Sequence, residues 1–89
     1  MELRHLRYFI AAAEHESVRV ASERIHVTQP AISRQIQQLE VELGVLLFER
    51  TPRGLRLTDA GTVYLEEARK VLALLDAAGR AARLTADGM

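Results

Sequence analysis

The chain has 89 residues, and its twelve basic and twelve acidic side chains give a formal net charge of zero. This length suffices for one compact domain, but not for a scaffold that also encloses a deep enzyme cavity. The absence of cysteine excludes a disulfide framework and a thiolate metal site. The longest apolar run, Tyr8 to Ala13, is far shorter than the roughly twenty residues that span a bilayer. Because the amino terminus also lacks the order of a secretory signal, we expect a cytoplasmic protein.

The helical period predicts a first helix from about Glu2 to Glu14. Its inward positions are Leu3, Leu6, Phe9, Ile10 and Ala13. Ser17 has the side chain of a good N-cap and precedes a short second helix, from Val18 to about Ile25. The inward positions of that helix are Val18, Ala21 and Ile25. The small Ala21 would let a third helix approach closely, as a helix-turn-helix requires.

The most informative segment is the predicted third helix, which Thr28 caps and which ends at Leu43, before Gly44. Its inward stripe is Ile32, Ile36, Leu39 and Leu43, and its outward residues are Gln29, Ser33, Arg34, Gln37 and Gln38. No acidic residue occurs between Thr28 and Leu39. Gln matches the donor and acceptor on the edge of adenine, and Arg matches the two acceptors of guanine. The outward face is therefore predicted to read bases in the major groove.

A small hairpin is predicted next, with a turn at Thr51-Pro52-Arg53-Gly54. Proline suits the second position of a turn, and glycine suits the place where a positive φ is often needed. Arg50 to Leu57 contains three arginines and no acid. Arg53 at the tip is expected to reach the minor groove or its phosphates, the alternative being a solvated turn residue. Arg50 and Arg56, on the arms, are expected to touch the DNA backbone, although Arg50 could instead pair with Glu40 or Glu42.

A long helix is predicted from the N-cap Thr58 to about Arg83, about 39 Å at 1.5 Å per residue. So long a helix needs another surface to pack against. Its apolar stripes suggest that one side covers the domain and that the other pairs with a second copy of the chain. The residues predicted for dimerisation are Tyr64, Ala68, Val71, Leu72, Leu75, Ala78 and Ala82. Leu65 also belongs, with Leu72, to a second stripe. Residues 85–89 lack periodicity and are expected to fray.

Taken together, these segments resemble the amino-terminal DNA-binding domain of the LysR-type transcriptional regulators of bacteria. The motifs that carry the resemblance are Leu6-Arg7-Tyr8-Phe9, Ala21-Ser22-Glu23-Arg24-Ile25, Val27 to Ile36, Leu39 to Gly44, Leu47-Phe48-Glu49-Arg50 and Leu57-Thr58-Asp59-Ala60-Gly61. The resemblance covers nearly the whole chain. The chain departs from the family pattern at Val18 and Val20, where an aromatic residue and an alanine are more usual.

The resemblance implies a mainly α, winged helix-turn-helix fold at 1–58, a dimerisation helix at 59–84 and a frayed tail at 85–89. It also implies a homodimer on an interrupted palindrome, and a tetramer is possible in a full-length protein. Residues that it places in the major groove are Gln29, Pro30, Ala31, Ser33, Arg34 and Gln37, with Arg53 on the wing. An effector-binding domain is absent from these 89 residues, so an inducer could act only through a domain outside them. We therefore expect the DNA-binding part of a longer regulator, or a stand-alone paralogue of it.

Roles on this surface are hypotheses. Gln29 and Arg34 are the expected base readers, although Gln29 could serve only as a first-turn cap and phosphate contact. Ser33 and Thr28 are candidates for phosphate contacts, although for Thr28 a purely structural cap is the favoured role.

The sequence offers little for other chemistry. The spacing of His5, His15 and His26 does not suit a metal site, and no side chain is placed to activate Ser33. No glycine-rich phosphate cradle occurs. We expect no enzymatic activity, cofactor or metal. The competing interpretations are a winged-helix protein-interaction module without DNA specificity and a bare coiled-coil dimeriser.

Overall fold

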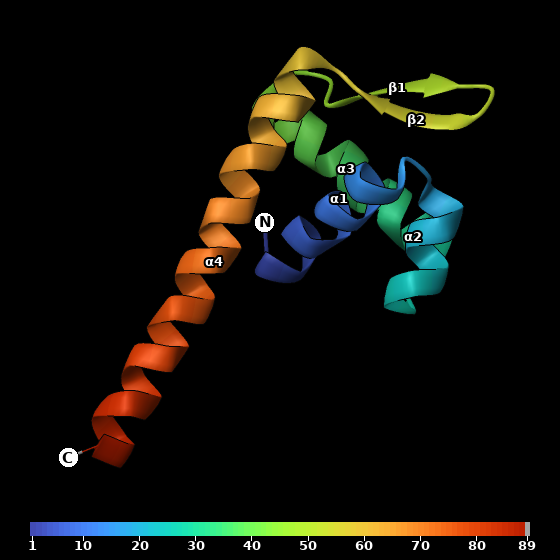
Figure 1. The fold of residues 1–89 in the computed structure, drawn as a ribbon. Coiled ribbons are helices and arrows are strands. Elements are labelled where there is room, and N and C mark those ends of the chain that lie inside the picture. The colour runs from blue at the N-terminus through green and yellow to red at the C-terminus, as the bar shows by residue number, and fades with distance from the viewer. Residues whose placement is uncertain (89) are drawn as a thin grey trace.

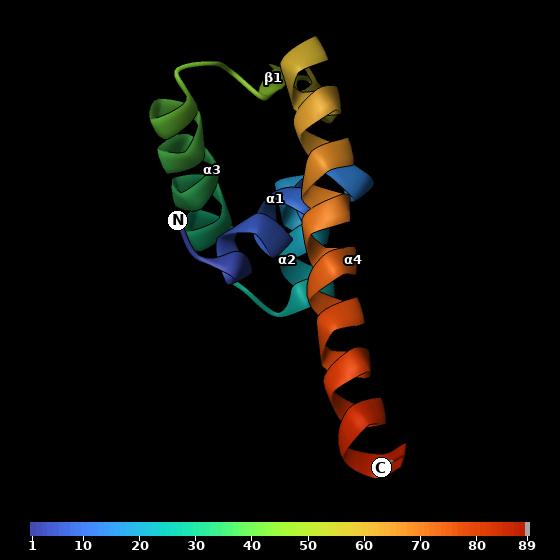
Figure 2. The same cartoon turned by 90° about the vertical axis from the view of Figure 1, so that its left-hand side faces the viewer.

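The computed structural model describes residues 1–88 and consists of four helices and one two-stranded sheet (Figure 1). The elements follow one another as α1 (Leu3–His15), α2 (Val18–Ile25), α3 (Gln29–Leu43), β1 (Phe48–Thr51), β2 (Gly54–Leu57) and α4 (Asp59–Gly88). Helices α1, α2 and α3 pack against one another, and α4 leaves this body as a long rod. The turned view places α3 and α4 on opposite sides of α1 (Figure 2). This arrangement is the mainly helical winged-helix fold that the sequence predicts.

The predicted caps of α2 and α3 and the predicted end of α3 are confirmed. The Ser17 hydroxyl oxygen accepts the N–H of Val20 at 3.1 Å, and the Thr28 hydroxyl oxygen accepts the N–H of Ala31 at 3.4 Å. Gly44 ends α3 with a φ of 73°, in the left-handed region that glycine adopts without strain. Each cap satisfies a backbone group that the helix itself leaves free.

The core lies where the three helices meet the hairpin and the first half of α4. Phe9 and Ile32 are fully buried, and Ala21 is small enough to be buried completely between α2 and its neighbours. The Phe9 ring lies 5.4 Å from the Phe48 ring and 5.2 Å from the Tyr64 ring, measured between centroids. Aromatic pairs at this separation add to the free energy gained by burial. Phe9 thereby ties α1 to both β1 and α4.

Two of the predicted inward positions are wrong. Leu3 is 46% exposed because it stands in the first turn of α1, beyond the reach of the other helices. Leu43 is 42% exposed because it is the last residue of α3, where the chain has already passed the edge of α1. In both cases the helical period assigned the right face, but the helix end projects past the core.

The hairpin is antiparallel, with Phe48 opposite Leu57 and Thr51 opposite Gly54. Pro52 and Arg53 form the predicted turn, and Gly54 follows with a φ of 135°. A side chain on Gly54 would overlap the carbonyl oxygen of Glu16, which also accepts the N–H of Leu55 at 3.0 Å. The wing is therefore pressed against the turn between α1 and α2.

Helix α4 begins as predicted and ends later than predicted. The Thr58 hydroxyl oxygen accepts the N–H of Gly61 at 2.9 Å, which caps the helix. The predicted helix end near Arg83, with a frayed tail from residue 85, is wrong for 85–88, because α4 continues to Gly88; Met89 lies outside the described residues. Only Gly61, Leu65 and Ala68 of this helix are buried. No helix among residues 1–88 combines the length and apolar character needed to cross a membrane.

Candidate nucleic-acid interface

The outward residues of α3 lie on the surface, as the sequence predicts. Gln29, Arg34, Gln37 and Gln38 are exposed, and Ser33 is half-buried. We call these five residues the polar face of α3. Ile32, Ile36 and Leu39 anchor the opposite side of the helix in the core. The face thus presents amides and a guanidinium from a rigid helix.

The amino-terminal turn of α3 adds backbone donors to this face. Thr28 and Pro30 are exposed and Ala31 is half-buried. The first turn contains no acidic side chain, so nothing on this turn neutralises the positive end of the helix dipole. Backbone N–H groups at such an end favour an anion.

The wing carries its arginines on two faces of the hairpin. Arg50 is opposite Leu55, and both residues line a groove of about 440 Å³ together with Ser33 and Gln37 of α3. Arg50 makes no ion pair within residues 1–88, and its predicted alternative with Glu40 or Glu42 is therefore not formed. The structure thus brings Arg50 beside the polar face of α3.

Arg56 points to the other face of the hairpin, where it pairs with the cross-strand Glu49 at 2.6 Å. The Glu49 carboxylate, by hydrogen bond and by charge, raises the pKa of Arg56 above its usual value. Arg56 is therefore already engaged within the hairpin, which makes it a poorer candidate for DNA than Arg50 or Arg53.

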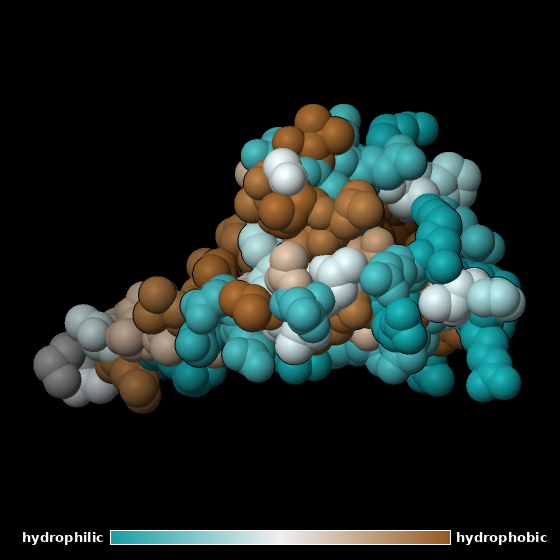
Figure 3. Space-filling model, turned by 90° about the horizontal axis from the view of Figure 1, so that it is seen from above, coloured by the Kyte–Doolittle hydropathy of each residue, from teal (hydrophilic) through white to brown (hydrophobic). Residues whose placement is uncertain are grey.

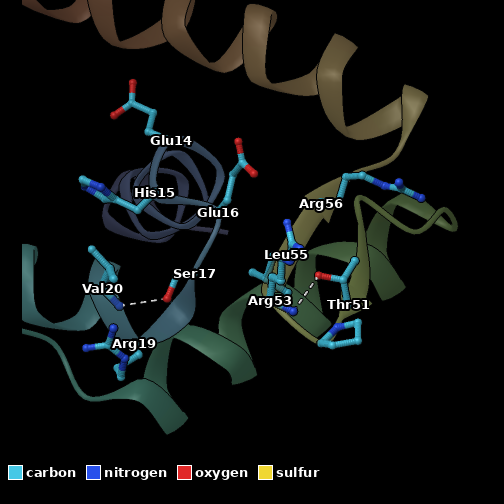
Figure 4. Close-up of a pocket in the computed structure, with 11 residues that line it drawn as sticks. Glu14, His15, Glu16, Ser17, Arg19, Val20, Thr51, Arg53, Leu55 and Arg56 are labelled. Atoms are coloured by element: carbon cyan, nitrogen blue, oxygen red, sulfur yellow. Dashed lines mark hydrogen bonds between the residues drawn. The ribbon is translucent and has the colours of Figure 1, made fainter.

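Arg53 stands at the tip of the wing, beside a polar pocket of about 760 Å³ (Figure 4). The tip is stiffened because the Thr51 hydroxyl oxygen accepts the N–H of Arg53 at 3.3 Å. Across the pocket lie the end of α1, with Glu14, and the start of α2, with Arg19. Sequence reasoning missed Arg19, and its position in the first turn of α2, two residues after the Ser17 cap, is the signal that could have found it. Arg19 pairs with Glu23 at 3.3 Å, as Arg56 does with Glu49, whereas Arg53 makes no ion pair within residues 1–88.

The predicted dimerisation set divides into two groups. Ala68 is buried, and Tyr64 and Leu72 pack against the core, so these three positions cover the chain's own body. Ala68 is therefore taken up by the chain's own body, whereas a dimer contact at the half-buried Tyr64 and Leu72 stays a prediction. Burial, followed by the charge of Glu42, raises the pKa of Tyr64, in keeping with its position.

The remaining members of the set are exposed and apolar. Val71 is 47% exposed and Leu75 is 43% exposed, and Ala78 and Ala82 continue the same side of the helix. Leu74, which sequence reasoning missed, is 72% exposed. It lies three residues after Val71 and four before Ala78, and this spacing places it on the same side of the helix as both. The heptad pattern therefore identifies Leu74 once the buried side of α4 is known. We call Val71, Leu74, Leu75, Ala78 and Ala82 the outward stripe of α4.

Viewed from above, the space-filling picture shows apolar side chains gathered over one part of the body, with the far end of α4 projecting to the left (Figure 3). The exposed large apolar residues near the end of α3 are Val41, Leu43, Val45 and Leu46. Leu43, Val45 and Val63 line a pocket of about 460 Å³ beside the first turns of α4. Exposed apolar surface thus lies both on the body and along the rod.

Residues 3–62 match the family model described as bacterial regulatory helix-turn-helix protein, lysR family. The chain belongs to the LysR family. The resemblance drawn from the sequence motifs is therefore confirmed.

Curated LysR-type regulators align with most of this chain. The transcriptional regulator ClcR of Pseudomonas putida is 60% identical over 72 residues, covering 81% of this chain and 24% of ClcR. The regulator TcbR of Pseudomonas sp. strain P51 is 50% identical over 88 residues, covering 99% of this chain and 30% of TcbR. The chain spans about a quarter of the length of ClcR and of the regulator TfdS of Cupriavidus pinatubonensis.

Solved LysR-type structures share the fold closely. The DNA-binding domain of CbnR, crystallised in complex with DNA, has a TM-score of 0.91 and 50% identity, covering 97% of this chain and 99% of that one. The DNA-binding domain of BenM with its catB site 1 DNA has a TM-score of 0.93 and 42% identity, covering 100% of this chain and 99% of that one. The winged-helix body and the long helix thus recur together in both DNA complexes.

Proposed function

We propose that this chain binds double-stranded DNA in a sequence-specific manner as a dimer of a transcriptional regulator. The observation that carries the proposal is the polar face of α3, which is mostly exposed, free of acidic residues and bordered by Arg50 across the groove that Ser33 and Gln37 also line. The complexes of the similar domains of CbnR and BenM with DNA support the same assignment. The chain is formally neutral, so this local concentration of arginine and amide groups has to supply the attraction.

The polar face of α3 lies in the major groove in this proposal. Gln29 reads adenine and Arg34 reads guanine, because their side chains can each make two hydrogen bonds to one base edge. Ser33 and the first turn of α3 contact phosphates, and Arg53 on the wing tip enters the flanking minor groove. The full proposed contact set is Thr28, Gln29, Pro30, Ala31, Ser33, Arg34, Gln37, Arg50 and Arg53.

The domain organisation follows the same division. Residues 1–58 form the DNA-binding body, and the helix from Asp59 joins two copies through its outward stripe. The dimer then presents two polar faces to inverted half-sites of an interrupted palindrome.

A protein-interaction module without DNA specificity is not favoured. The centre of a protein interface usually holds aromatic anchors, and the four aromatic residues, Tyr8, Phe9, Phe48 and Tyr64, are buried or half-buried in the body. The relatives are named as transcriptional regulators. No observation on the polar face points to another kind of partner.

The test is selection of bound duplexes from a random-sequence pool, followed by titration of the selected duplex at several salt concentrations. We expect two inverted half-sites separated by about one helical turn or a multiple of it. The logarithm of the binding constant should fall with the logarithm of salt by about 0.9 for each phosphate neutralised. A pool that yields no enriched sequence, together with binding that is insensitive to salt, would refute the proposal.

A further inference from the structure

Three consecutive residues, the last two of the loop after α3 and the first of β1, are held by hydrogen bonds from a side chain of α3 and from the residue that caps α4. We call Leu46, Leu47 and Phe48 the joint. On the α3 side, the half-buried Glu40 accepts the N–H of Leu47 at 2.7 Å and the N–H of Phe48 at 3.3 Å. A carboxylate that accepts two backbone donors forms stronger hydrogen bonds than a neutral acceptor. Glu40 thereby fixes the direction in which the chain leaves α3.

On the α4 side, the carbonyl groups of the same residues are held. The Thr58 hydroxyl donates to the Leu46 carbonyl oxygen at 2.7 Å, and the Thr58 N–H donates to the Leu47 carbonyl oxygen at 3.0 Å. Gly61, in the first turn of α4, lies so close to the Leu47 carbonyl that any side chain there would overlap it. The peptide groups on either side of Leu47 are therefore bonded to α3 through their donor and to α4 through their acceptor.

These contacts lie in the segment that follows α3, where it passes the start of α4. The loop that leaves α3 crosses to β1 beside the first turns of α4 (Figure 2). Both helices also pack against α1, and the end of α3 lies beside the first turns of α4, where Leu43 and Val63 line one pocket. Apolar packing is non-directional and holds helices together without selecting one orientation as strictly as hydrogen bonds do.

We propose that the joint, held by Glu40, Thr58 and Gly61, sets the angle between the polar face of α3 and the outward stripe of α4, and thereby the half-site spacing that the dimer accepts. The inference rests on the proposed function for its DNA consequence. In a dimer joined through α4, this angle decides how far apart the two polar faces lie and how they are turned. Changing the spacing by one base pair moves one half-site by about 3.4 Å and rotates it by about 35° around the duplex. A rigid joint cannot follow such a shift, whereas a loosened joint can.

The experiment compares Glu40→Gln and Thr58→Val with the unsubstituted chain on duplexes that carry the selected half-sites at spacings altered by one and two base pairs. Thr62→Val is the matched control, because the Thr62 hydroxyl donates at 3.2 Å to the Thr58 carbonyl within α4 and does not touch the joint. Thr58→Ser keeps the hydroxyl and should behave as the unsubstituted chain does. A duplex with a single half-site reports whether base reading itself is intact.

We expect both joint variants to lose at least about fivefold of the preference for the selected spacing, the worth of one ordinary hydrogen bond. Glu40→Gln removes the charge from two hydrogen bonds to the joint, and Thr58→Val removes the bond to Leu46 together with the cap on Gly61. Their affinity for the single half-site should change less than about twofold, within the small effect expected where no contact to DNA is removed. Spacing profiles that superimpose on that of the unsubstituted chain would overturn the proposal. Equal flattening by Thr62→Val would overturn it as well.

A second measurement tests the joint without DNA. The chain contains no cysteine, so spin labels can be attached specifically at Gln38→Cys on α3 and Ala73→Cys on α4. Labelled chains are diluted into an excess of unlabelled ones, so that the measured distance is the one between the two labels of a single chain. We expect one narrow distance distribution for the unsubstituted chain and for Thr62→Val, and a broadened one for Glu40→Gln and Thr58→Val. An unchanged distance distribution in the joint variants would refute the proposal that the joint fixes the angle between α3 and α4. If the chain selects no duplex, the proposed function fails, and this distance measurement still decides the role of the joint.

Discussion

The polar face of α3 and the outward stripe of α4 both point away from the body, but the cost of exposing them to water differs. The amide and guanidinium groups on α3 are satisfied by water, so their exposure costs the free protein little. The exposed Val71, Leu74 and Leu75 on α4 have no such substitute, because apolar surface in water is unfavourable. The comparison indicates that the polar face of α3 is stable without a ligand, whereas the second half of α4 gains stability when a partner covers its apolar side chains. We therefore expect the dimer to form before and without DNA.

The largest effect is expected at the centre of the outward stripe. Replacing Leu74 by Glu, at a position 72% exposed in the single chain, should leave the body folded and prevent pairing of α4. A dimer contains this leucine twice, and burying one is worth roughly 1.5–3 kcal/mol, so dimer dissociation should rise by about a hundredfold or more. Sedimentation equilibrium measures the dissociation constant.

Ala73→Glu is the matched control for this prediction. Ala73 is exposed on α4 but lies off the outward stripe, so the same charge at this position should leave the dimer intact. If both variants dissociate equally, added charge rather than the stripe is responsible, and the comparison between the two regions fails.

The second effect concerns the polar face itself. Arg34→Ala and Gln29→Ala should each reduce the ratio of affinities for the selected and a scrambled duplex by about fivefold to a hundredfold, the worth of one bidentate base contact. Competition titrations measure this ratio. Gln38→Ala, on the same exposed face but outside the proposed contact set, should keep it. A uniform loss on both duplexes would instead assign Gln29 and Arg34 to the phosphates.

A smaller effect is expected at the wing tip. Arg53→Ala should reduce the magnitude of the logarithmic salt slope by about 0.9 per binding site and weaken any preference for A·T pairs beside the half-site. Titrations at several salt concentrations, on duplexes with different flanks, measure both quantities. Arg56→Ala should change the slope less, because Glu49 already pairs with Arg56. Identical slopes for Arg53→Ala and the unsubstituted chain would show that the tip does not touch DNA.

The smallest effect separates two helix caps of the same kind. Ser17→Ala and Thr28→Ala each remove one cap hydrogen bond and should lower the free energy of unfolding by about 1 kcal/mol. Urea unfolding measures the change. Only Thr28 lies beside the polar face of α3, so only its substitution should also weaken DNA binding. If Thr28→Ala leaves DNA binding unchanged under conditions where the variant is fully folded, Thr28 is a structural cap alone.

The sequence predicted the helices, their caps and the hairpin turn well because each of these depends on nearby residues. Ser17, Thr28 and Gly44 act within one turn of where they stand, so their roles are visible in the chain. The exposure of the polar face was predictable for the same reason, since Ile32 and Ile36 define the opposite side.

The rest depends on contacts between distant segments. The period of α4 permits several neighbouring stripes, and only the packing of Ala68 and Leu72 on the body shows that Leu74 points outward. The contacts of Glu40 with Leu47 and of Thr58 with Leu46 link segments whose geometry no local pattern specifies. Leu43 was misassigned because the sequence does not reveal where α3 passes the edge of the core.

The central claim is that side chains on α3 read base edges in the major groove, and base-by-base removal of the purine N7 atom tests it most directly. The selected duplex is prepared with 7-deazaadenine or 7-deazaguanine at each position in turn, and each is titrated with the unsubstituted chain, Gln29→Ala and Arg34→Ala. We expect at least one deazaadenine to weaken the unsubstituted chain but not Gln29→Ala, and at least one deazaguanine to weaken it but not Arg34→Ala. If every deaza duplex binds the unsubstituted chain as tightly as the parent duplex does, the polar face does not read the major groove and the account is wrong.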